Sequence, residues 1–92
     1  MIGRIPCCAA LILLLGLSKE VWADKAASYN RKGIQEYNAK QYEASVQQFT
    51  EALIERPDTP ELQFNRGTGL SALGKKEEAI TELNTAARGF KD

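Results

Sequence analysis

The sequence contains no histidine, and its only cysteines are the neighbours Cys7 and Cys8 near the start. It has three prolines, one tryptophan and no net charge, because twelve basic residues balance twelve acidic ones. Histidine and cysteine are the usual ligands of zinc and other soft metals, so their scarcity argues against such a site. The balanced charge gives no electrostatic reason to expect binding to nucleic acid or to an anionic membrane surface.

The segment Met1–Ala23 differs in kind from the rest of the chain. Arg4 provides a positive start, residues 5–17 form a nearly continuous apolar run, and residues 21–23 read Val-Trp-Ala. This layout is typical of a secretory signal peptide. The apolar run is shorter than the roughly 20 residues that a transmembrane helix needs. The sequence therefore predicts cleavage after Ala23, with an uncleaved membrane anchor as the alternative.

Cleavage would remove both cysteines and leave residues 24–92, which carry ten basic and eleven acidic residues. Without thiols this part of the chain forms no disulfide. We expect an exported, nearly neutral protein, for which a bacterial periplasm is the natural location.

The sequence of the exported part, residues 24–92, predicts helices and no strand. Helix formers without proline fill its first segment, and the next segment carries apolar residues at the 3.6-residue period of a helix. The connecting turns are short, so consecutive helices are expected to run antiparallel, as two hairpins. The predicted helices cover residues 25–39, 42–55, 60–73 and 76–88.

Turn signals set the limits of the third helix. Pro57 prevents the second helix from continuing, Thr59 has the side chain of a helix N-cap, and Pro60 suits the first helical position. Gly74 predicts the stop, because glycine readily adopts the left-handed conformation that ends many helices.

Several residues recur 34 positions later in the chain. The pairs are Gly33 and Gly67, Phe49 and Leu83, and Ala52 and Ala86. A fixed period of this length indicates stacked supersecondary units and is typical of paired helices. On these residues the chain resembles the tetratricopeptide repeat (TPR) family.

Gly33 and Gly67 lie inside predicted helices, where glycine costs about 1 kcal/mol relative to alanine. We therefore expect them where two helices approach closely, Gly33 against Ser45 and Gly67 against Ala79. In the fourth helix, the residues expected to point inward are Ala79, Ile80, Leu83, Ala86 and Ala87.

Several positions depart from the family pattern, among them Lys32, Arg66 and Lys40. Lys32 and Arg66 stand where these repeats often place leucine, and we expect their stems to cover apolar surface while their charges reach water. Lys40 stands where the second repeat has Gly74.

The resemblance implies an all-α fold of two tandem antiparallel helix-turn-helix hairpins, forming a short right-handed α-solenoid after the signal peptide. Repeat one would cover about 26–59 and repeat two about 60–92. The first helix of each hairpin would line a concave groove, where solenoids bind extended segments or helices. By resemblance, the groove positions are Asn30, Arg31, Ile34, Tyr37, Asn38, Phe64, Asn65, Thr68, Ser71 and Ala72.

Three of these positions have a structural alternative. Asn65 can pair with the neighbouring hairpin, Phe64 can pack between repeats, and Tyr37 can belong to the core. The resemblance otherwise implies an exported protein-interaction module or scaffold that binds a partner peptide or helix within a bacterial envelope complex. The alternative is a self-associating or truncated repeat unit with a structural role and no groove ligand.

The sequence offers no nucleophile–base pair, metal cluster or phosphate loop. Glu77-Glu78 and the pair Glu51 and Glu55 lack a partner base, and acidic pairs on helices usually face solvent. The glycine-rich Gly67-Thr68-Gly69 lies in a helical pattern with no preceding strand. We therefore expect no enzyme, no cofactor and no small-molecule substrate.

The fourth helix is expected to keep one face for another molecule. Ala79, Ala86, Ala87 and Phe90 would contact whatever packs next, either a second copy in a homodimer through this helix or the partner protein. The alternative is a small exposed strip, mostly of alanine, that a monomer tolerates.

Overall fold

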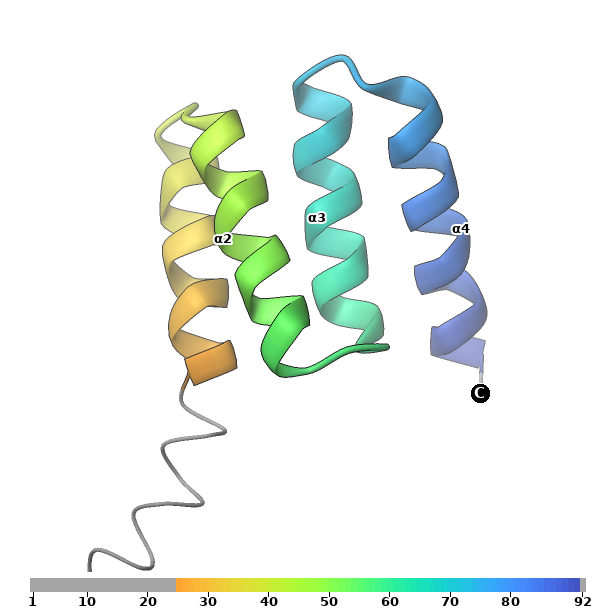
Figure 1. The fold of residues 1–92 in the computed structure, drawn as a ribbon. Helices are drawn as coiled ribbons and strands as arrows, with labels where there is room; N and C mark the ends of the chain where they lie inside the picture. The colour runs from red at the N-terminus through yellow and green to blue at the C-terminus, as the bar shows by residue number, and fades with distance from the viewer. Residues whose placement is uncertain (1–24, 92) are drawn as a thin grey trace, which may run out of the picture.

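A computed structural model describes residues 25–91 of the chain. The predicted signal peptide, residues 1–23, lies outside these described residues. Four helices and no strand occur in residues 25–91, so the all-α prediction is confirmed. The first helix covers 25–38, followed by α2 (Tyr42–Glu55), α3 (Pro60–Ala72) and α4 (Lys76–Lys91). Figure 1 shows them side by side, each running opposite to the one before it.

The same turn ends the first helix and α3. The backbone N–H of Gln41 donates to the carbonyl of Glu36 at 2.7 Å, and that of Lys75 donates to Leu70 at 3.0 Å. In each turn the residue before the donor, Lys40 or Gly74, has a left-handed φ, of 64° and 85°. These bonds satisfy carbonyls at the end of a helix. The predicted stop at Gly74 is confirmed, and Lys40 adopts the same conformation at the corresponding position of the first hairpin.

The start of α3 differs in one respect from the prediction. Pro60 occupies the first turn as expected. Thr59 is the N-cap residue, but its side chain forms no hydrogen bond to the helix, so the predicted side-chain cap is wrong. Its hydroxyl instead donates to the carbonyl of Arg56 at 2.9 Å and closes the turn that follows α2.

The close approach of the first helix to α2 is built as predicted. The hydroxyl of Ser45, which is fully buried, donates to the carbonyl of Gly33 at 2.7 Å. A methyl group placed on Gly33 would lie 2.6 Å from Cε1 of Phe49, whose side chain is only 2% exposed. Glycine is needed there because the ring of Phe49 fills the space that a side chain would occupy.

The second hairpin repeats the contact between a glycine and a large apolar side chain. A methyl group on Gly67 would lie 2.8 Å from Cγ of Leu83. Leu83 follows Phe49 by 34 positions, and in both hairpins a large apolar side chain lies over a glycine.

The inward face of α4 is narrower than predicted. Ala79 and Ala86 are already buried within the chain, so the prediction that they contact another molecule is wrong. Ile80 and Ala87, expected to point inward, are exposed. α4 packs against α3 and lies at the edge of the row of helices (Figure 1), so a single neighbour covers only part of its apolar surface. No helix in residues 25–91 is long and apolar enough to cross a membrane.

Candidate partner-binding groove

Five of the predicted groove residues surround one hollow between the first helix and α3. Its volume is about 190 Å³. It is lined by Ile34 and Tyr37 from the first helix, Phe64, Asn65 and Thr68 from α3, and Phe49 from α2. The 34-residue period places Ile34 and Thr68 at corresponding positions, which explains why both helices offer residues to the same hollow.

The hollow is mainly apolar and partly open. Ile34 is 41% exposed and Phe64 is 50% exposed, whereas Phe49 is buried and belongs to the core. Phe64 therefore does not pack fully between the repeats, and half of its surface faces solvent. Exposed aromatic and branched side chains around one hollow are typical of binding surfaces.

Two polar side chains border the hollow. The amide of Asn65 donates to the side-chain oxygen of Asn30 at 2.9 Å, which joins α3 to the first helix. The structural alternative for Asn65, pairing with the neighbouring hairpin, is thus what the contacts show. Thr68 donates its hydroxyl to the carbonyl of Phe64 at 2.9 Å. The side-chain oxygens of Asn65 and Thr68 keep the capacity to accept a hydrogen bond from a partner.

Tyr37 lies beside the hollow and contacts a second aromatic residue. Its ring packs edge-on against that of Tyr42, with centroids 5.2 Å apart, at the turn between the first helix and α2. It is half-buried and also lines the hollow. The contact with Tyr42 fixes the orientation of the Tyr37 ring where it lines the hollow.

The other predicted groove residues are not brought to this hollow. Arg31, Asn38, Ser71 and Ala72 do not line it. Asn30 is half-buried and reaches it only through its bond to Asn65. Phe49, which also lines the hollow, was not among the predicted groove residues.

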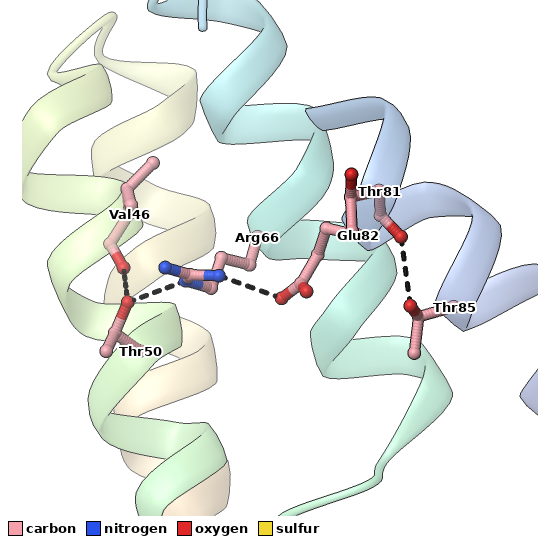
Figure 2. A network of polar contacts seen from close by, with 6 residues as sticks. All are labelled: Val46, Thr50, Arg66, Thr81, Glu82 and Thr85. Carbon is pink, nitrogen blue, oxygen red and sulfur yellow. Dashed lines mark hydrogen bonds and ion pairs between the residues drawn. The ribbon is translucent and has the colours of Figure 1, made fainter. Parts of the chain in front are cut away.

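Arg66 of α3 forms two contacts that the sequence did not predict. Its Nε donates to the hydroxyl of Thr50 on α2 at 2.9 Å, and its Nη1 pairs with a carboxylate oxygen of Glu82 on α4 at 3.0 Å. Figure 2 shows the guanidinium between the two helices. Its charge is paired with Glu82, and 28% of its side chain remains exposed to solvent. One side chain of α3 therefore links α2 to α4.

Residues 25–91 contain no group of three or more histidine, cysteine, aspartate or glutamate side chains placed to hold a metal ion. Comparisons with models of protein families, with curated proteins and with solved structures find no match to this chain. Its function is therefore inferred from the hollow and from the repeat.

Proposed function

We propose that the chain is a short protein-interaction module of the tetratricopeptide type, which binds a peptide or helix of a partner protein in the groove between the first helix and α3. The observation that carries this proposal is the hollow around Phe64, where half of a large aromatic side chain faces solvent beside the exposed Ile34. Covering such surface stabilises a complex by roughly 25 cal/mol for each Å² removed from water.

The size of the hollow favours a side chain of a partner over a free small molecule. Sites for small molecules typically measure about 300–1,000 Å³. A hollow of about 190 Å³ is smaller than these sites. It fits one apolar anchor side chain, while the oxygens of Asn65 and Thr68 can accept hydrogen bonds from the partner's backbone or side chains.

Two recurrent features support the proposed relation to tetratricopeptide repeats. The turns after the first helix and α3 use the same backbone hydrogen bonds at positions 34 apart. A glycine under a large apolar side chain also recurs with this spacing, as Gly33 under Phe49 and Gly67 under Leu83. On this basis we propose two repeats wound as a right-handed α-solenoid.

The proposed location follows from the segment Met1–Ala23. A positive start, a short apolar run and the Val-Trp-Ala site favour export of the chain, with the groove working in a periplasmic envelope complex. The second candidate function is a self-associating structural unit with an empty groove, which the exposed residues of α4 favour.

Site-specific photo-crosslinking tests the proposal. A photoreactive phenylalanine analogue replaces Phe64 in the full chain, which is expressed with its own N-terminal segment in a bacterial host. The matched control carries the analogue at Ile54 of α2, which is 63% exposed and does not line the hollow. We expect a discrete adduct with another protein from position 64 and none from position 54.

A third variant separates specific from chance adducts. Ile34→Glu places a charge in the hollow, so it should suppress the adduct from position 64. An adduct that survives Ile34→Glu, or equal adducts from positions 64 and 54, would contradict groove binding. An adduct whose mass equals two copies of the chain would favour the structural alternative.

A further inference from the structure

A second hollow lies in the same groove, nearer the start of the first helix and of α3. Its volume is about 260 Å³. Its walls come from these two helices and from the connection between α2 and α3, which Figure 1 shows at the end of the molecule where the first helix starts. This hollow is lined in part by charged side chains, Arg56 and Glu61, whereas the hollow around Phe64 is lined by none. We call the two the polar hollow and the apolar hollow.

The repeat aligns the two hollows along one groove. Ala27 and Glu61 line the polar hollow and are 34 positions apart. Ile34 and Thr68 line the apolar hollow and are also 34 positions apart. On each helix the residues of the two hollows are seven positions apart, which keeps them on one face. At about 1.5 Å per residue, the hollows are about 10 Å apart along the groove.

A pair of amides separates the hollows. Asn65 lines the apolar hollow and Asn30 lines the polar hollow. The amide of Asn65 donates to the side-chain oxygen of Asn30 at 2.9 Å. Asn30 keeps its own amide N–H groups as donors beside the polar hollow. A partner that reaches from one hollow to the other crosses this pair.

Two opposite charges line the polar hollow without pairing. Arg56 and Glu61 are both exposed. The only ion pair within residues 25–91 joins Arg66 to Glu82, so the charges of Arg56 and Glu61 lie too far apart for direct contact. A single group that accepts a hydrogen bond at one end and donates one at the other can contact both.

The chemistry of the polar hollow favours a carboxamide. A carboxylate from a partner would be attracted to Arg56 and repelled by Glu61, and an ammonium group would experience the reverse. A carboxamide is neutral, and it offers an oxygen to Arg56 and an amide N–H to Glu61. Hydrogen bonds to ionised groups are stronger than those between neutral groups. With a volume of about 260 Å³, the hollow suits a side chain better than a free small molecule.

We propose that the polar hollow takes the side chain of a glutamine or asparagine from the same partner segment whose apolar side chain fills the apolar hollow. This inference rests on the proposed function and adds to it the chemistry of a second contact. The partner segment carries an apolar and a carboxamide side chain about 10 Å apart. The apolar contact supplies most of the affinity, and the carboxamide supplies specificity, because charged side chains at its position are repelled.

Selection of random peptides displayed on phage, against the purified full chain, tests the proposal. Peptides that bind the groove are recognised because they fail to bind Ile34→Glu. We expect these peptides to share an apolar residue and a glutamine or asparagine at a constant spacing. Groove-binding peptides without a shared carboxamide would overturn this inference and leave the proposed function standing. Absence of any peptide that depends on Ile34 would contradict both.

Charge variants assign the carboxamide to the polar hollow. Glu61→Gln leaves Arg56 as the only charge that lines it. A selected peptide whose carboxamide residue is changed to glutamate should therefore bind Glu61→Gln about tenfold more tightly than the wild-type chain in titration calorimetry. The same peptide with lysine at this position should gain similarly from Arg56→Gln.

The matched control is Glu43→Gln, which removes an exposed carboxylate of α2 that lines neither hollow. It should leave the affinity for both altered peptides unchanged, and all three variants should melt as the wild type. Equal affinities of the altered peptides for the wild-type chain, Glu61→Gln and Arg56→Gln would overturn the proposal.

Discussion

Replacement of Gly33 by alanine tests the packing on which the first hairpin depends. The added methyl group would lie 2.6, 2.8 and 2.9 Å from three atoms of the Phe49 ring. Carbon atoms in good contact are about 3.5–4.0 Å apart, so the ring would have to retreat by about 1 Å. Phe49 is only 2% exposed, so most of its surface is already in contact with neighbouring atoms.

Two opposing effects decide whether Gly33→Ala stabilises or destabilises the chain. Alanine in place of glycine favours the helix by up to about 1 kcal/mol. Forcing an extra group into a packed core costs typically about 1–3 kcal/mol. Because three atoms of a buried ring are involved, we expect the upper part of that range and a net loss of about 1–2 kcal/mol. In a domain of this size each kcal/mol lowers Tm by about 4–8 °C.

Thermal melts followed by circular dichroism measure the loss, with Gly69→Ala as the matched control. At Gly69 the only close atom is the terminal Cγ2 of Val46, at 2.8 Å, and the next lies at 4.0 Å, so a small shift relieves the contact. Gly33→Ala should therefore melt well below Gly69→Ala. If Gly33→Ala melted at or above the wild-type temperature, the contact with Phe49 would not explain the glycine.

Three further predictions concern other parts of the chain. Lys40→Gly should stabilise the chain by about 0.5–1 kcal/mol, because Lys40 has the left-handed φ that Gly74 adopts without strain; an unchanged or lower Tm would show that Lys40 is unstrained. Arg66→Met should cost about 1 kcal/mol in urea unfolding, and a double-mutant cycle with Glu82→Gln should give a coupling of about 0.5–1 kcal/mol; strictly additive effects would mean that the ion pair contributes nothing. N-terminal sequencing of the exported protein should begin at Asp24, and a full-length product retained in membranes would refute cleavage after Ala23.

The helices were predictable because their signals are local. Apolar periodicity, Pro60 and Gly74 act over short distances in the sequence, and α2 has the predicted bounds Tyr42–Glu55. The end of α4 was not predicted correctly. The helix was expected to end at Arg88, and it continues to Lys91. Gly89 does not end α4. A side chain at this position would lie 2.7 Å from Pro60, so α4 packs closely against the start of α3 at Gly89. Tertiary packing overrides the tendency of glycine to end a helix.

The burial of individual faces was harder to predict because it depends on neighbours. Ile80 lies on an apolar stripe, and periodicity alone indicated an inward position. Only the packing of α4 on α3 shows that the small residues Ala79 and Ala86 take the covered positions, while Ile80 stays exposed. Arg66 is a similar case, since both of its partners lie 16 positions away in sequence.

The groove was predictable in part, through the repeat. Corresponding positions on the first helix and α3 brought Ile34, Tyr37 and Phe64 to one hollow. Other predicted residues of those helices, such as Arg31 and Ser71, lie outside it, because helix periodicity fixes a face but not how far along it the hollow extends.

The most direct test of the account is the affinity of the partner captured through position 64 for two variants of the chain. Ile34→Glu puts a charge in the hollow, and Ile54→Glu puts the same charge on an exposed isoleucine outside it. Losing the contact of one buried apolar side chain costs about 1.5–3 kcal/mol, which corresponds to a tenfold or greater rise in Kd. Titration calorimetry should show this rise for Ile34→Glu and none for Ile54→Glu, with both variants melting as the wild type. Wild-type affinity in Ile34→Glu would contradict binding in the groove.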